Sequence, residues 1–235
     1  AHGAAIVMHS LTKYIGGHGT SIGGIVVDGG NFDWTKNRKR QPLLNEPDQS
    51  YGGAVWIDAV PQLTGANIPF VIRLRVVLLR DTGAPLAPFN AWQIIQGLET
   101  VGLRMKQHCS NAEKVVTFLE TQKKVQNVIY PTNHQGEIKE RALKYMKGGY
   151  GSLVGMDVGT KENGAKFIDN LKMLYHVANI GDARSLAIHP ATTTHSQLND
   201  KELLAAGVTP GYVRLSIGIE HPDDIIADIK QALAA

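Results

Sequence analysis

Cysteine is nearly absent from this sequence, which contains one, Cys109, among 235 residues. A single cysteine excludes a disulfide framework within the chain and is typical of a reducing compartment, so we predict a cytoplasmic protein. Long apolar runs are lacking as well, because the most apolar stretch, residues 68–79, is interrupted by Arg73 and Arg75. We therefore predict no transmembrane segment and no membrane partner.

A strong charge of one sign is missing too. The formal net charge is +3 at pH 7, which does not by itself indicate a nucleic-acid partner. One basic cluster, residues 36–40, could be a nucleic-acid or localisation patch, but a solvated loop is the favoured interpretation. No group of histidine, cysteine or carboxylate residues has the spacing of metal ligands, so we predict no metal.

The most informative stretch of the chain is residues 8–19. A short apolar run, residues 6–8, is typical of a strand, and three glycines then interrupt regular structure. Two hydroxyl groups and one amine follow the strand, on Ser10, Thr12 and Lys13. The hydroxyl groups are suited to a phosphate and the amine to an aldehyde, and pyridoxal phosphate carries both groups on one ring.

These residues form the pattern Ser-x-Thr-Lys-Tyr-x-x-Gly-His-Gly, which resembles the lysine signature of the Cys/Met-metabolism family of pyridoxal-phosphate enzymes. The resemblance covers essentially the whole chain, and its further motifs lie at residues 23–34, 88–91, 97–100, 189–195 and 214–220. It implies an α/β protein of the fold-type I, aspartate aminotransferase-like class of pyridoxal-phosphate-dependent transferases. It also implies pyridoxal 5'-phosphate as the cofactor.

The resemblance assigns roles to the residues around the lysine. It implies that Lys13 is the catalytic residue, which binds the cofactor as a Schiff base and then carries protons. It implies that Ser10 and Thr12 bind the cofactor phosphate. The alternatives are an ordinary lysine at a strand end and hydroxyl groups that bond only to the backbone.

Two further residues are expected to bind the substrate. Arg214 lies in an apolar strand, where a lone charge is costly, so we expect either a structural ion pair or a bidentate clamp on an α-carboxylate. The resemblance favours the clamp, and it implies that Asn179 helps to bind the same carboxylate. For Thr194 and His195, in a loop that matches a family motif, a structural role is at least as well supported as substrate contact.

Within the family, the sulfhydrylase branch is the most similar. The implied reaction is γ-replacement on O-acetyl-L-homoserine by sulfide or a thiol, which gives L-homocysteine or L-methionine and acetate in methionine and cysteine biosynthesis. A γ-lyase of the same family, an inactive fragment acting as an assembly partner, and a nucleic-acid module remain as alternatives. The resemblance also implies a homo-oligomer, a dimer of dimers with shared active sites.

In the family, a large part of the chain precedes the cofactor lysine. It carries an aromatic residue that stacks on the cofactor, an aspartate that pairs with the pyridine nitrogen, and a phosphate loop. None of these is found upstream of Lys13, so we expect this sequence to be one piece of a longer protein and a poor enzyme alone.

The element pattern predicts two neighbouring buried strands at residues 5–10 and 21–27, then a polar surface excursion over residues 29–62. A helix is predicted from Asn90 to about Thr121, with an apolar stripe on which His108 and Cys109 have structural roles. Further strands are predicted at 125–130, 151–158, 177–180 and 213–217, and helices at 138–146, 163–174, 200–206 and 222–233. We place a domain boundary after Thr121, with residues 1–121 in the larger domain and 122–235 in a small α/β domain.

Overall fold

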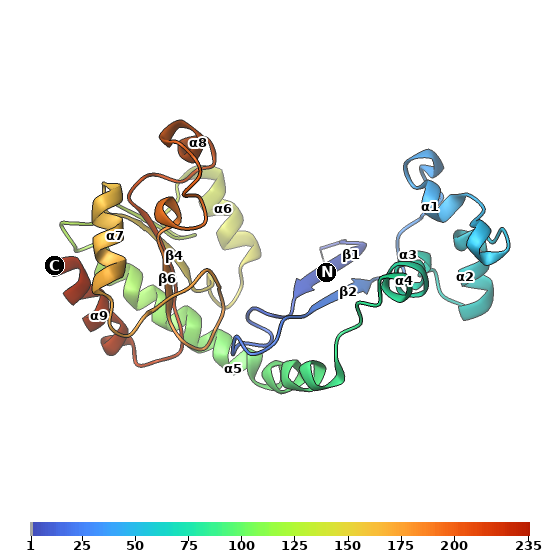
Figure 1. Ribbon diagram of the computed structural model, residues 1–235, viewed down its shortest axis with the longest axis horizontal. Helices are drawn as coiled ribbons and strands as arrows, with labels where there is room; N and C mark the ends of the chain where they lie inside the picture. Colours follow the sequence, from blue (N-terminus) through green and yellow to red (C-terminus); the bar gives the residue numbers. More distant parts are fainter. Residues whose placement is uncertain (1) are drawn as a thin grey trace. The chain divides into compact units, whose positions relative to one another are not determined.

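The computed structural model describes residues 2–235, and it divides the chain into two compact units. The first unit comprises the residues up to Leu11 and residues 22–91; the second comprises residues 12–21 and 92–235 (Figure 1). The turn that contains Lys13 therefore belongs to the second unit, although both flanking strands belong to the first. The predicted boundary after Thr121 concerns the domains of a complete protein, and it stays a prediction.

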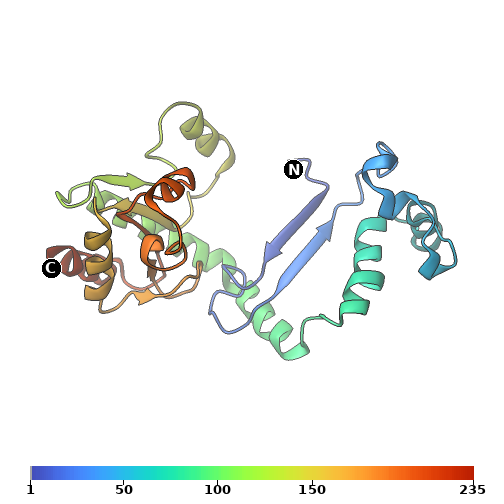
Figure 2. The ribbon, with the colours of Figure 1, turned by 45° about the horizontal axis from the view of Figure 1, so that its top comes forward.

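The first unit begins with a hairpin of two antiparallel strands, β1 (Ile6–Ser10) and β2 (Gly24–Asp28), seen side by side in Figure 2. Ile6 pairs with Asp28 and Ser10 with Gly24. The expected strands are therefore present, but the expectation that they are buried is not met. Most of their side chains are exposed, and that of Met8 is 78% exposed.

Short helical segments follow the hairpin. They are η1 (Arg38–Arg40), α1 (Pro42–Asn45), η2 (Gln49–Tyr51), α2 (Trp56–Thr64), α3 (Pro69–Arg73), the π-helical η3 (Leu74–Leu79) and α4 (Arg80–Thr82). Trp34, Trp56 and Val60 form the centre of an apolar cluster, and Trp34 stacks on Phe70 with ring centroids 5.5 Å apart. Two tryptophans supply enough apolar area to order this stretch, so the predicted excursion has a small core of its own.

The helix α5 (Pro88–Leu119) has nearly the predicted bounds. Its second half is buried along the predicted stripe, from Cys109 to Leu119. In its first half the buried positions are Ile94, Gly97 and Arg104, whereas Ile95 and Leu98 of the predicted stripe are 54% and 51% exposed.

The second unit is built on a five-stranded sheet in the order β3-β4-β7-β6-β5. Its strands are antiparallel neighbours except for the parallel pair β5 and β6. The strands are β3 (Asn127–Ile129), β4 (Leu153–Asp157), β5 (Tyr175–His176), β6 (Leu186–Ile188) and β7 (Tyr212–Ser216). The prediction located β3, β4 and β7, placed β5 a few residues late and missed the short β6.

Helices close one face of this sheet and leave the other partly open. The helices of the unit, besides α5, are α6 (Gly136–Tyr145), α7 (Lys161–Asn170), α8 (Asp200–Ala205) and α9 (Pro222–Ala234), and η4 is Pro190–Thr192. Alternate strand residues such as Val154 and Val213 join side chains of α5, α7 and α9 in the main core. Because side chains alternate across a strand, Gly155 and Arg214 lie on the opposite face.

Among the described residues, no single helix meets the length and apolarity of a membrane span. One bent pair, Trp56–Thr64 with Pro69–Thr82, meets that criterion together, by length and composition only, across a bend of 99°.

Candidate functional site

Lys13 lies half-buried in a tight turn of the second unit. The turn is closed by a hydrogen bond from the amide of Gly17 to the carbonyl of Lys13 (2.7 Å). The Lys13 ammonium donates to Oδ1 of Asn179 at 2.5 Å. Within residues 2–235, no carboxylate oxygen lies within 4.0 Å of this ammonium, so its charge is not neutralised by an ion pair.

Arg214 lies in the middle of β7, between the buried residues Val213 and Leu215. Its Nη2 donates to the main-chain oxygen of Asn179 at 3.2 Å. Its Nε is buried and has no hydrogen-bond partner. A buried donor without a partner is costly, so this guanidinium has an edge that an added anion would satisfy.

Asn179 connects these two cations. Its side-chain oxygen accepts from Lys13 and its main-chain oxygen accepts from Arg214, while its own amide donates to Val177 (2.9 Å). The structure therefore brings together three of the five predicted site residues, which are 35 to 201 positions apart in the sequence. An amine, an amide and a guanidinium thus lie in one cluster, and such donors can bind a small carboxylate.

Tyr14, the residue after the lysine, anchors the turn in the second unit. Its hydroxyl is hydrogen-bonded to that of Ser152 (2.9 Å), and its ring meets the ring of His108 edge-on at 5.5 Å. Burial raises the pKa of Tyr14, which keeps the phenol protonated. Burial lowers the pKa of His108, whose Nδ1 donates to the carbonyl of Ile217 (2.6 Å), so this imidazole is neutral and structural, as predicted.

The segment after Asn179 also holds the turn. The amide of Ala183 donates to the carbonyl of Gly17 (2.8 Å). Gly181 has a φ of +72°, and a Cβ at this position would lie 2.7 Å from the main-chain nitrogen of Tyr14. Asp182 is 4% exposed; burial alone would raise the pKa of its carboxyl, but hydrogen bonds from the side chain and amide of Arg184 outweigh this effect and lower it. The lysine turn is thus packed against a stretch that is itself charged and ordered.

Arg104 contacts the same turn from α5. Its guanidinium donates to the carbonyls of Tyr14 (2.8 Å), Ile15 (3.1 Å) and Gly97 (2.6 Å). Burial lowers the pKa of Arg104 from its usual high range. Arg104 was not predicted as a site residue, because in the sequence it is one polar position of a helical pattern; its seven-residue spacing from Gly97, two helical turns, was the available signal.

The other residues predicted to be functional are not part of the cluster of Lys13, Asn179 and Arg214. Ser10 ends β1 and is exposed in the first unit, whereas Thr12 is half-buried in the second unit with Lys13. Thr194 and His195 form a turn after η4, in which their side chains share a hydrogen bond of 2.9 Å. Residues 36–40 are exposed.

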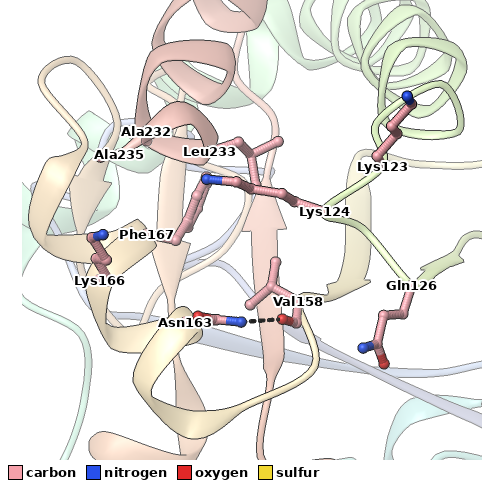
Figure 3. Close-up of a pocket in the computed structure, with 10 residues that line it drawn as sticks. All are labelled: Lys123, Lys124, Gln126, Val158, Asn163, Lys166, Phe167, Ala232, Leu233 and Ala235. Carbon is pink, nitrogen blue, oxygen red and sulfur yellow. Dashed lines mark hydrogen bonds between the residues drawn. The ribbon is translucent and has the colours of Figure 1, made fainter.

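Two hollows of the second unit are lined by residues other than Lys13. One, of about 290 Å³, is lined by Lys123, Lys124, Lys166 and Phe167, and the Asn163 side-chain amide donates to the carbonyl of Val158 at its edge (3.0 Å; Figure 3). Phe167 belongs to the main core, so this cleft opens on the helix-covered side of the sheet. The other, of about 500 Å³, lies between α6 and the face that carries Arg214. In residues 2–235 no group of three or more His, Cys, Asp or Glu side chains could hold a metal ion.

The sequence matches the profile of the Cys/Met metabolism PLP-dependent enzyme family over residues 1–234. The chain belongs to this family. The match includes the turn of Lys13, Asn179 and the strand of Arg214, so the three clustered residues all lie within the region that defines the family.

Among curated members of the family, an O-acetyl-L-homoserine sulfhydrylase of Leptospira meyeri is 49% identical, over 99% of this chain and 53% of that protein. A homocysteine synthase of Schizosaccharomyces pombe is 46% identical, over 99% of this chain and 53% of that protein. The chain therefore spans about half the length of the curated relatives that it matches.

A crystal structure of a Campylobacter jejuni O-acetylhomoserine (thiol)-lyase matches the fold with a TM-score of 0.89 and 41% identity, covering 100% of this chain and 55% of that chain. It contains N'-pyridoxyl-lysine-5'-monophosphate, a lysine joined to the cofactor. The fold of this chain is accordingly that of the fold-type I pyridoxal-phosphate transferases, as the sequence predicted.

Proposed function

We propose that this chain is the cofactor-lysine part of an O-acetyl-L-homoserine sulfhydrylase, also called O-acetylhomoserine aminocarboxypropyltransferase. The reaction would replace the acetoxy group at Cγ of O-acetyl-L-homoserine by sulfide or a thiol, giving L-homocysteine or L-methionine and acetate in methionine and cysteine biosynthesis. The names of the relatives support this reaction. The observation that carries the proposal is the cluster of Lys13, Asn179 and Arg214, because it combines a free amine with a carboxylate site.

The residues present fit pyridoxal phosphate. Lys13 offers an amine that is hydrogen-bonded to the neutral side chain of Asn179 and, within residues 2–235, has no ion pair, so displacing this partner leaves no unpaired carboxylate. Thr12 and Ser10 would hold the phosphate through their hydroxyl groups. When bound, the cofactor supplies an electron sink that stabilises negative charge on the substrate carbons.

Arg214 and Asn179 would hold the α-carboxylate of the amino acid. The buried Nε of Arg214 lacks a partner, and a guanidinium edge matches the two oxygens of a carboxylate. The main-chain oxygen of Asn179 fixes the orientation of that guanidinium from one side. A carboxylate held at Arg214 would place the substrate Cα within reach of Lys13, because both cations contact the same asparagine.

Lys13 would then act as the proton carrier. Its amine would take the proton from Cα and transfer a proton at Cβ, which allows acetate to leave from Cγ. Sulfide or a thiol adds at Cγ, and the same amine returns the protons in reverse order. Over the cycle the protons taken from Cα and Cβ are both returned, and the proton of the incoming thiol leaves with acetate, so the exchange balances with one mobile amine as the proton carrier.

The test is reduction of the complete protein with borohydride after addition of pyridoxal phosphate, followed by peptide mass mapping. We expect a pyridoxyl adduct on Lys13 and none on this peptide in a Lys13→Ala variant. The control variant Lys106→Gln, at an exposed position of α5, should retain the adduct. An adduct on another lysine, or none, would contradict the proposal.

A product assay separates replacement from elimination. Homocysteine as the main product from O-acetyl-L-homoserine and sulfide supports the sulfhydrylase, whereas dominant release of an α-keto acid and ammonia would assign the chain to a γ-lyase.

We further propose a cytoplasmic homo-oligomer, a dimer of dimers with shared active sites and no nucleic-acid, membrane or metal partner. The compartment is supported by the single cysteine, which is buried and free.

A further inference from the structure

The two carbonyl groups that directly follow Lys13, those of Tyr14 and Ile15, accept hydrogen bonds from one side chain of α5. Arg104 donates from Nη1 to the carbonyl of Tyr14 and from Nη2 to those of Ile15 and Gly97. Its Nε donates to the hydroxyl of Thr100 at 3.2 Å. Every nitrogen of this guanidinium therefore has an acceptor, and two of the acceptors are consecutive carbonyls of the lysine turn.

Arg104 is an unusual residue for this position, because it is a buried cation without a counter-charge. It is 6% exposed. Among the described residues no carboxylate oxygen lies within 4.0 Å of it. Burial of an unpaired charge is costly unless hydrogen bonds compensate for the lost water. A neutral apolar residue would fill this contact between helix and turn at a lower desolvation cost. The structural role of the guanidinium is therefore in the carbonyl groups that it orients.

Two glycines make room for this contact. A Cβ on Gly97 would lie 2.2 Å from the carbonyl oxygen of Gly16, and a Cβ on Gly17 would lie 2.2 Å from Nη1 of Arg104. Gly17 also has a φ of +70°, which favours glycine. The backbone of the turn is thus in direct contact with both the helix and the guanidinium, and it has no freedom to shift toward α5.

We propose that Arg104 is a positioning residue for Lys13, which acts by fixing the two peptide groups after it. This inference rests on the proposed role of Lys13 as the cofactor lysine. The Tyr14 and Ile15 carbonyls are held by Arg104, and the Lys13 carbonyl is held by the Gly17 amide, so the main chain of the lysine is constrained on its C-terminal side. With its main chain fixed, the Lys13 side chain can reach the reacting atoms by rotation about its own side-chain bonds alone.

A lysine could not replace this arginine. An ammonium group is a point donor, whereas the planar fork of a guanidinium spans two carbonyls and still has an edge for a third acceptor. Arg104→Lys keeps the positive charge and loses the simultaneous contacts with Tyr14, Ile15 and Gly97. The substitution therefore tests geometry separately from charge.

The experiment compares Arg104→Lys with two controls in the complete protein. Val115→Ala removes a fully buried side chain from the same helix within the main core, and Lys106→Gln removes an exposed charge two residues from Arg104. The readouts are kcat and KM with O-acetyl-L-homoserine, the unfolding midpoint, and amide hydrogen exchange of the peptide containing residues 14–17 in the cofactor-free protein. Hydrogen exchange reports the turn independently of catalysis.

For Arg104→Lys we expect kcat to fall about 10- to 100-fold with KM changed by less than about 3-fold, and exchange in residues 14–17 to rise at least about 10-fold. Val115→Ala should lower the unfolding midpoint and leave kcat and the exchange of residues 14–17 unchanged. Lys106→Gln should leave all three quantities unchanged. The inference is overturned if Arg104→Lys behaves as Val115→Ala does.

If Arg104→Lys does not fold, the Thr100→Val variant tests the inference instead. It removes one acceptor of Arg104, and a smaller change in the same two readouts supports the inference, whereas no change in either overturns it. Failure of the proposed function gives a different result, because the wild-type protein would then lack the pyridoxyl adduct on Lys13 while exchange in Arg104→Lys would still rise.

Discussion

At the scale of the residue, Arg214 shows how a polar group in an apolar strand indicates a function. It lies between two fully buried side chains, and its register partner on β4 is Gly155, over which the ring of Tyr212 packs. Burying a charged side chain in this position costs free energy, and within residues 2–235 only its Nη2 has a hydrogen bond. The other nitrogens of the guanidinium can donate hydrogen bonds to the anion of a ligand.

We predict that Arg214→Lys raises the KM for O-acetyl-L-homoserine about 10- to 100-fold, because a bidentate contact with the α-carboxylate becomes a single one. The KM for sulfide should change little, since sulfide carries no carboxylate. Steady-state kinetics of the complete protein with each substrate varied in turn measures both values. Arg80→Lys, at an exposed arginine, is the control. Equal increases in the two KM values would contradict the assignment of Arg214.

At the scale of the element, Asp228 joins α9 to the turn before β5. It is 6% exposed, and its carboxylate accepts hydrogen bonds from the amides of Lys172, Met173 and Leu174, each at 2.9 Å. Burial alone would raise the pKa of Asp228, but the amides of Leu174, Lys172 and Met173 outweigh it, so the pKa lies below its ordinary value. The negative charge is therefore the form that stabilises the fold.

We predict that Asp228→Asn lowers the free energy of unfolding by about 2 kcal/mol near neutral pH, because an amide oxygen accepts fewer and weaker hydrogen bonds. A carboxyl with a depressed pKa contributes its full stability above its unfolded pKa of about 3.9 and loses it as the pH falls through the lower folded pKa. The difference from wild type should thus be constant above about pH 5 and shrink toward pH 3.

Urea unfolding at several pH values measures this difference. Asp169→Asn, an exposed residue of α7, should behave as wild type at every pH. A deficit in Asp228→Asn that persists unchanged at the lowest pH would show that the substitution acts through packing and not through the charge.

At the scale of the whole molecule, the chain spans about half the length of its curated relatives, and many of its apolar side chains are exposed. Examples are Met8, Ile22 and Leu103, which are 78%, 80% and 72% exposed. Exposed apolar groups on this scale are typical of surfaces that other protein covers. This is consistent with the proposal that the complete protein self-associates.

We predict that the complete protein is a homo-oligomer with a mass about four times that of its chain, since closed symmetric assemblies are the common form. Light scattering coupled to size-exclusion chromatography measures the mass. A monomer that retains full activity would contradict both the assembly and the shared sites. Affinity for nucleic acid that fell steeply with added salt would instead support the nucleic-acid alternative.

Local chemistry determined much of the fold. The apolar period of α5 and the proline and aspartates at the start of α9 specified two helices nearly to the residue, because capping and periodicity act over a few neighbouring positions. β6, with three residues, was too short to give a period and was missed. The buried face in the first half of α5 was also mispredicted, since the lysine turn, distant in sequence, selects Gly97 and Arg104 for contact.

By itself the sequence determined the family and the fold, because several motifs in the same order resemble those of the family, and it supplied the candidate site residues as predictions. Only the tertiary structure decided that Asn179 lies between Lys13 and Arg214, and that Arg104 holds the turn. These contacts join residues on separate elements, and their geometry depends on how those elements pack. A local pattern carries no information on a distance set by packing.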